Sequence, residues 1–121
     1  MRDEPEREEL AARTRRFAVR IVRMCGRLPQ RMETQVIGRQ VLKSGTSVGA
    51  QFREAKRARS DAEFVSKLES ALQELDETSY WFELLVECQI VAADKLADLQ
   101  READELTAIL VTIVRKVKGA S

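Results

Sequence analysis

The spacing of apolar residues is the feature that most constrains how this chain folds. Between positions 10 and 28, residues suited to a helix core recur at alternating steps of four and three: Leu10, Thr14, Phe17, Ile21, Met24 and Leu28. This spacing places them on one face of an α-helix. Three later segments show similar spacing, so the sequence predicts an all-α chain of amphipathic helices.

Local signals indicate where these helices begin and end. Asp3 suits the N-cap position ahead of Pro5, and Pro29 ends the first helix because the residue before a proline is pushed out of the α region. The segment Ser60–Glu63 matches a capping box, and Asp94 suits a fourth N-cap. We expect one domain over residues 1–121. Short connections favour an antiparallel up-and-down four-helix bundle, with helices at about 4–28, 33–59, 61–89 and 94–118.

The third and fourth segments carry more apolar surface than a surface helix needs. Beside the stripe that contains Phe64 and Leu68, the third segment has a second stripe with Val65 and Leu72, and "AILVTIV" in the fourth is apolar nearly all round. A surface helix needs one stripe a little over 100° wide. Surplus exposed in a monomer would mark an interface, so we expect a homo-oligomer. Central positions within the bundle are the alternative explanation.

The composition argues against catalysis. The chain has no histidine, so a general base would have to be a carboxylate, a lysine or a cysteine. The E-x-x-H motif of di-iron bundles is therefore missing, and Cys25 and Cys88 form neither a zinc-ligand spacing nor a redox pair. We expect no enzyme activity, no cofactor and no metal. A site built only of carboxylates, for instance around Glu74 and Glu77, is the alternative.

The sequence also indicates where the protein works. No run of about eighteen apolar residues is present, so we expect no membrane span. The first residues, MRDEPEREEL, are charged where a secretory signal would become apolar. We expect a cytoplasmic protein.

The net charge of +1 hides a strong asymmetry along the chain. Residues 10–59 contain thirteen Arg and Lys against two acids, whereas residues 60–121 contain six against thirteen. Such a division indicates either an anionic partner or two halves that attract each other within the fold or the assembly.

Five arginines form a line along the first helix at steps of three and four, with no acid between Leu10 and Met32. A planar guanidinium engages phosphate in a bidentate manner, and each neutralised phosphate releases counterions. With few aromatic residues to stack on bases, backbone contact with little sequence selectivity is expected, to RNA or to DNA. Arg53 and Glu54 are assigned to structure. The predicted nucleic-acid-binding residues are Arg13, Arg16, Arg20, Arg23, Arg27, Lys56, Arg57 and Arg59.

Ion pairing is the alternative role for this line. An acidic line on the third helix could pair with the arginines, within one subunit or between subunits. The acids concerned are Glu69, Asp76, Glu83 and Glu87, with Glu74 and Glu77 nearby.

The segment KSGTSVGAQFREA, residues 43–55, resembles a phosphate loop only in composition. A P-loop needs G-x-x-x-x-G-K-[ST] after a strand, and that pattern is absent. Gly45 and Gly49 instead share a helix face with Gly38. Each glycine costs a helix about 1 kcal/mol relative to alanine, so we expect a compensating close approach by another backbone or by a large ring, with Trp81 or Tyr80 as the candidate ring.

The stretch from 42 to 85 resembles a known four-helix-bundle family, named for proteins encoded in intervening sequences of bacterial 23S ribosomal RNA. The family motif, roughly S-G-T-S-(I/V)-G-A-N-x-x-E-A followed by E-x-x-x-W-x-x-L-L, is matched from Ser44 to Ala55 and from Glu77 to Leu85. Gln51 departs from it, because the family usually has asparagine there. The resemblance extends from about Phe17 to Val117.

The resemblance implies an assembly and a setting. Family members are similar to one another in forming pentameric rings, and the family looks related to accessory variability proteins of diversity-generating retroelements. Those relatives bind nucleic acid through basic surface and associate with a reverse transcriptase. The implied function is a non-enzymatic, nucleic-acid-binding accessory of that kind. A protein–protein adaptor or scaffold, whose charge asymmetry serves self-assembly, is the alternative.

Overall fold

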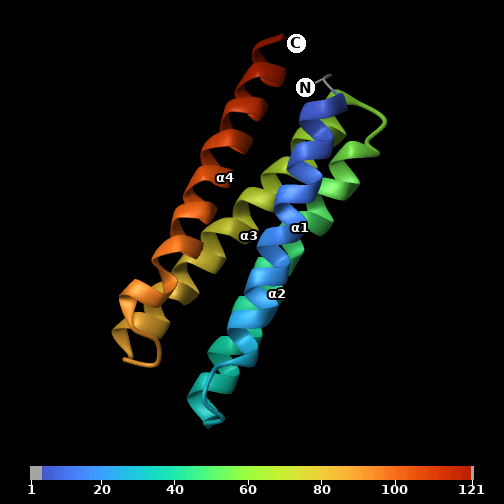
Figure 1. Ribbon diagram of the computed structural model, residues 1–121. Coiled ribbons are helices and arrows are strands. Elements are labelled where there is room, and N and C mark those ends of the chain that lie inside the picture. Colours follow the sequence, from blue (N-terminus) through green and yellow to red (C-terminus); the bar gives the residue numbers. More distant parts are fainter. Residues whose placement is uncertain (1–3, 121) are drawn as a thin grey trace.

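The computed structural model describes residues 4–120, which form four α-helices joined by short connections. The helices are α1 (Glu4–Gly26), α2 (Met32–Lys56), α3 (Asp61–Glu87) and α4 (Ala93–Ala120). Successive helices run in opposite directions, so the start of α1 and the end of α4 lie at the same end of the molecule (Figure 1). No strand occurs between residues 4 and 120. The prediction of an all-α four-helix chain is confirmed.

The helix ends follow the local sequence with some differences. Ser60 caps α3, because its hydroxyl accepts a hydrogen bond from the backbone N–H of Glu63 at 3.1 Å. The Glu63 carboxylate reaches back to the N–H of Arg59 at 3.5 Å. α2 ends at Lys56, before the expected end near position 59. Asp94 is not the cap of α4 but lies in its first turn, where a carboxylate favours the positive end of the helix dipole. Asp3, the predicted first cap, lies outside the described residues.

The end of α3 has a chain reversal that the sequence did not indicate. Gln89 adopts a φ of 59°, in the left-handed region that usually takes glycine. The N–H of Gln89 donates to the carbonyl of Val86 at 3.0 Å, and the N–H of Ile90 donates to that of Leu85 at 2.9 Å. These two bonds make a Schellman motif, which turns the chain towards α4.

The core runs through the middle of the bundle. Each helix contributes side chains that are almost fully buried, among them Phe17, Phe52, Phe82, Leu106 and Leu110. Removing one such side chain from water stabilises the fold by about 1.5–3 kcal/mol.

The expected exposure of surplus apolar surface on α3 and α4 is wrong for the side chains that the structure describes. α3 packs against α2 on one side and α4 on the other, so its second stripe faces a neighbouring helix. In the second half of α4, Ile113, Val114 and Val117 are buried. The exposed large apolar side chains belong mainly to α1 and α2: Val19, Val22, Met32, Val36 and Leu42, with Tyr80 of α3.

Candidate nucleic-acid interface

The line of arginines on α1 divides into one paired residue and four exposed ones. Arg13 donates two hydrogen bonds to the carboxylate of Glu102 on α4, at 2.7 and 2.8 Å, and lies 3.4 Å from the carboxylate of Glu105. The side chains of Arg13 and Glu102 are only 22% and 16% exposed. The remaining members are exposed and form no ion pair with any side chain that the structure describes: Arg16, Arg20, Arg23 and Arg27. We call these four the arginine stripe.

The electrostatics of the Arg13–Glu102 pair are shaped by the stripe. The hydrogen bond from Arg13 lowers the pKa of Glu102, although partial burial opposes the shift, and the positive charges of Arg20 and Arg16 lower it further. The same hydrogen bond raises the pKa of Arg13. One carboxylate therefore lies in the field of three guanidinium groups, which leaves this side of α1 positive.

The acids that pair with α1 do not belong to α3, as the ion-pairing alternative required. Helices α1 and α3 lie diagonally across the bundle and meet only through side chains such as Arg7 over the ring of Phe64, whereas α1 packs directly against α2 and α4. None of the five arginines in the line pairs with a described acid of α3, so this alternative is wrong within one subunit, and the pair that forms uses α4. On α3, Glu69 instead binds Lys118 of α4 at 3.0 Å.

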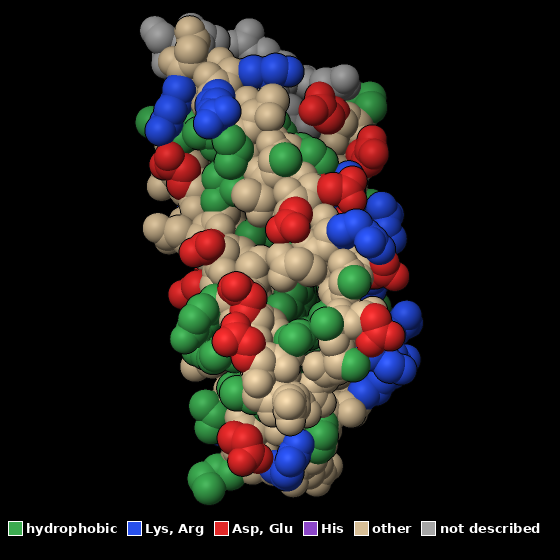
Figure 2. Space-filling view, turned by 90° about the vertical axis from the view of Figure 1, so that its left-hand side faces the viewer, with side chains coloured by type: hydrophobic (Ala, Val, Ile, Leu, Met, Phe, Trp, Pro, Cys, Tyr) green, Lys and Arg blue, Asp and Glu red, His purple; other side chains and the backbone are tan. Residues whose placement is uncertain are grey.

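The acidic residues of the second half of the chain form an acidic area on one side of the bundle. Figure 2 shows the left-hand side of Figure 1, formed by α3 and α4, with acidic side chains spread over its middle. Basic side chains lie near the top of this view and along its right edge, where acidic side chains are interleaved with them. Glu102 of α4 lies close enough to Arg20 and Arg16 for their charges to lower its pKa, so acids of α4 border the arginine stripe.

Of the basic residues at the end of α2, one is ion-paired and the others are exposed. The ammonium of Lys56 binds the carboxylate of Glu8 on α1 at 2.6 Å. Arg57 and Arg59 are exposed. Arg53, which the sequence analysis assigned to structure, is also exposed and lines a groove between α1 and α2 together with Arg15.

Sequence reasoning missed Arg15 because it lies off the line of the other α1 arginines. Only the register between α1 and α2 brings it near Arg53, and that register follows from side-chain packing. The sequence signal that could have indicated Arg15 was the density of basic residues near the start of α1 and the end of α2.

The glycines of α2 explain this register. Cβ atoms added to Gly45 and Gly49 would have as nearest neighbours atoms of Ile21 and Thr14 in α1, and one added to Gly38 would meet Leu28, just beyond the end of α1. At Gly49 these neighbours include the α1 backbone, 3.5 Å away. A close approach of another backbone was expected, but Trp81 or Tyr80 as the filling ring is wrong, because the glycine line faces α1 rather than α3.

Trp81 still packs against the core as a half-buried side chain, and its ring meets that of Tyr80 edge-on at 4.9 Å.

Other polar residues of the small-residue segment hold α2 to α3. The hydroxyl of Thr78 lies 2.8 Å from that of Ser44, and both residues are buried. The nearby Gln51, at the position where the family motif has asparagine, has a buried Oε1 without a hydrogen-bond partner among the residues that the structure describes. This segment therefore serves packing on both of its sides.

The chemistry available elsewhere is limited. Among the described residues, no group of three Cys, Asp or Glu side chains is arranged to hold a metal ion. Burial raises the pKa of Glu74, and the neighbouring charge of Glu77 also contributes. No helix between residues 4 and 120 is long and apolar enough to cross a membrane.

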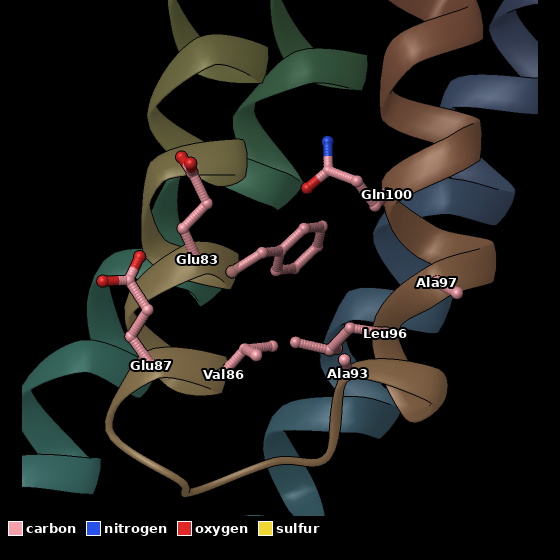
Figure 3. A pocket seen from close by; sticks show the side chains of 8 residues that line it. Glu83, Val86, Glu87, Ala93, Leu96, Ala97 and Gln100 are labelled. Carbon is pink, nitrogen blue, oxygen red and sulfur yellow. The ribbon is translucent and has the colours of Figure 1, made fainter.

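A hollow of about 280 Å³ lies between the end of α3 and the start of α4. Val86 and Leu96 point towards each other across it, and Gln100 lies above them on α4 (Figure 3). The carboxylates of Glu83 and Glu87 stand on its α3 side. The hollow is thus apolar inside with acids at its rim, which is unsuited to a phosphate.

The fold and these surfaces define a four-helix bundle with a basic edge and an acidic face. Residues 6–112 match the model of the 23S rRNA-intervening sequence protein family, and the chain belongs to this family. A solved structure of a protein with unknown function from the S23 ribosomal protein family of Bacteroides thetaiotaomicron is similar, with 35% sequence identity and a TM-score of 0.84. The alignment covers 90% of this chain and 97% of that one. No curated protein matches this chain.

Proposed function

We propose that this protein is a non-enzymatic, nucleic-acid-binding bundle that acts as a homo-oligomer. The observation that carries the proposal is the arginine stripe, in which four exposed guanidinium groups share one side of α1 without ion pairs to described side chains. Like charges three or four residues apart destabilise a helix by a few tenths of a kcal/mol per pair. An external anionic partner offsets that repulsion, and a nucleic-acid backbone offers a line of phosphates to match the line of arginines.

The proposed binding is to the backbone of RNA or DNA, with little reading of bases. Phosphate contacts position a protein on a nucleic acid without carrying sequence information. The stripe contains arginine but no aromatic side chain, so stacking on bases has no platform there.

The assembly is part of the proposal. Exposed valines on α1, Val19 and Val22, and exposed residues of α2 such as Val36 leave apolar surface that a partner copy would cover. By the family resemblance we propose a pentamer, in the cytoplasm, that serves as the accessory protein of a diversity-generating retroelement and associates with its reverse transcriptase. An adjacent reverse-transcriptase gene with a template repeat would support this setting.

Binding is tested by fluorescence anisotropy with labelled RNA and DNA hairpins. The variant carries Gln at positions 16, 20, 23 and 27, and keeps Arg13 because that residue holds α1 to α4. We expect tight binding by the natural protein at low salt and loss of binding by the variant. Light scattering must show that both have the same oligomeric mass.

A matched control separates the stripe from total charge. Replacing Arg39, Lys95, Arg115 and Lys116 by Gln also removes four positive charges, from exposed positions elsewhere on the bundle that form no ion pair with a described side chain. The proposal requires this control to bind nearly as well as the natural protein. Equal loss in both variants, or no binding by the natural protein, would contradict it.

A protein–protein adaptor or scaffold is the second candidate function. It is favoured by the pairing of Arg13 with Glu102 and Glu105, since a basic residue of α1 there meets acids of α4. If the arginine stripe of one copy paired in the same way with α4 acids of another copy, the stripe would serve self-assembly. In that case the stripe variant would dissociate the oligomer.

A further inference from the structure

A groove of about 540 Å³ runs between α1 and α2, near the start of α1 and the end of α2. Its lining includes small residues from both helices, among them Ala11, Gly49 and Ala50. A Cβ atom added at Gly49 would lie 3.5 Å from the backbone of Thr14, so the two helices approach each other closely at the floor of the groove. The floor of the groove therefore consists of backbone and small side chains.

The charges around this groove are strongly positive. Arg15 of α1 and Arg53, Lys56 and Arg57 of α2 line it, and Glu8 is the acid among the lining residues. Arg15, Arg53 and Arg57 are exposed and form no ion pair with any described side chain. Four cations thus share one carboxylate.

The Glu8 carboxylate lies where an external anion would bind Lys56. Lys56 donates to Glu8 Oε1 at 2.6 Å, and the lysine side chain is 21% exposed whereas that of Glu8 is 67% exposed. The hydrogen bond and charge of Lys56, with a smaller effect of Arg15, lower the pKa of Glu8. The carboxylate therefore lies on the solvent side of the lysine, in the path by which an external anion would reach it.

We propose that this groove is a second phosphate-binding surface, where Glu8 holds Lys56 until a backbone phosphate of the nucleic acid replaces it. The inference rests on the proposed nucleic-acid binding and adds to it a site separate from the arginine stripe. A phosphodiester presents two oxygens that Lys56 and the neighbouring forks of Arg15 and Arg53 can share. Glu8 competes with an incoming anion for Lys56 and so lowers the affinity of the site. An anion that binds more weakly than a nucleic-acid phosphate would therefore not displace the carboxylate.

Neutralising the acid of the groove and neutralising its arginines should change the affinity for nucleic acid in opposite directions. Glu8→Gln removes the competing charge, so we expect nucleic acid to bind roughly three- to fivefold more tightly near 0.15 M salt, about the effect of one phosphate contact. Arg15→Gln combined with Arg53→Gln removes two contacts, and we expect binding to weaken by more than roughly tenfold. In a Lys56→Gln background, Glu8→Gln should have little effect, because the residue that Glu8 occupies is gone.

Charge-matched controls exclude a general effect of net charge. Asp76→Asn removes one exposed acid from α3, and Lys95→Gln with Arg115→Gln removes two exposed cations from α4. Both controls should leave affinity within roughly twofold of the natural protein. Thermal unfolding curves must show that every variant folds.

The experiment is fluorescence anisotropy with the full chain and a labelled RNA hairpin and DNA duplex, repeated with inorganic pyrophosphate as competitor. Tighter binding by Glu8→Gln and weaker binding by the Arg15 and Arg53 variant would support the groove. If the natural protein binds but neither groove variant departs from its control, the groove inference is overturned while the stripe stands. If the natural protein does not bind at all, the proposed function itself fails. Pyrophosphate that displaces the nucleic acid from the natural protein but not from the groove variant would further support phosphate as the recognised group.

Discussion

Gly45 of α2 lies directly against Ile21 of α1. A Cβ atom at position 45 would be 2.8 Å from Ile21 Cγ1 and 2.9 Å from Cγ2, closer than carbon atoms can pack. Both atoms are attached to the branched Cβ of Ile21, so they can move aside only by rotation about χ1, which a branched side chain in a helix strongly resists. This contact sets the spacing between α1 and α2, and with it the position of Arg15 relative to Arg53.

Gly45→Ala should therefore destabilise the protein. Overpacking typically costs about 1–3 kcal/mol, while alanine gains about 1 kcal/mol of helix propensity over glycine. We expect a net loss of up to about 2 kcal/mol, measured by urea unfolding. Gly26→Ala is the control, since a Cβ at that exposed position would meet nothing within 4 Å, and its effect should stay small.

A second variant distinguishes the contact from other causes. Ile21→Ala removes the atoms that clash and alone costs about 2–5 kcal/mol through the lost burial. In that background Gly45→Ala should no longer destabilise. If the cost of Gly45→Ala is the same with and without Ile21, the contact does not explain the glycine.

The Arg13–Glu102 pair should make stability depend on pH in the acidic range. Because the folded protein lowers the pKa of Glu102, the unfolded chain binds its proton first as pH falls. The contribution of the pair is therefore complete above the ordinary glutamate pKa of about 4.3 and is lost as pH falls towards the lower folded value. We expect a double-mutant cycle with Arg13→Gln and Glu102→Gln to give a coupling of about 1–2 kcal/mol at pH 7.

The same cycle repeated at low pH tests the cause. Once Glu102 is protonated, the coupling should fall to a fraction of its value at neutral pH. A coupling that does not change between pH 7 and the acid limit of folding would mean that the pair is held by packing rather than by charge.

Gln89→Gly should stabilise the protein. The left-handed φ at this position costs a side-chain-bearing residue about 1–2 kcal/mol, and part of the gain from glycine is cancelled by the greater freedom of its unfolded chain. We expect a net gain of up to about 1 kcal/mol by thermal or urea unfolding. Gln89→Ala keeps the Cβ and serves as the comparison. A loss of stability with glycine would show that the Gln89 side chain has a role of its own.

The fold was predictable because its signals are local and repeated. The alternating spacing from Leu10 to Leu28 and the capping box at Ser60 each depend on residues within a few turns. The reversal at Gln89 was not predictable, because the left-handed conformation is imposed there by packing on a residue that does not favour it.

The candidate surfaces were only partly predictable, since they depend on how helices are paired. The line of α1 arginines follows from its spacing, but whether Arg13 is exposed depends on the position of Glu102 in α4, far along the chain. Likewise the small-residue face indicated close packing, while its partner, α1 rather than Trp81, follows only from three-dimensional contacts. The groove at Arg15 depends both on basic residues that are visible in the sequence and on the packing of α1 against α2, which is not.

The central claim is that the arginine stripe binds phosphates, and its most direct test is the salt dependence of nucleic-acid affinity. Arg20, Arg23 and Arg27 would be replaced by Gln one after another, and the slope of log K against log salt measured for each protein on duplex DNA. Each replacement that removes a phosphate contact should flatten the slope by about 0.9. If the slope does not change as the arginines are removed, they do not contact the backbone and the account is wrong.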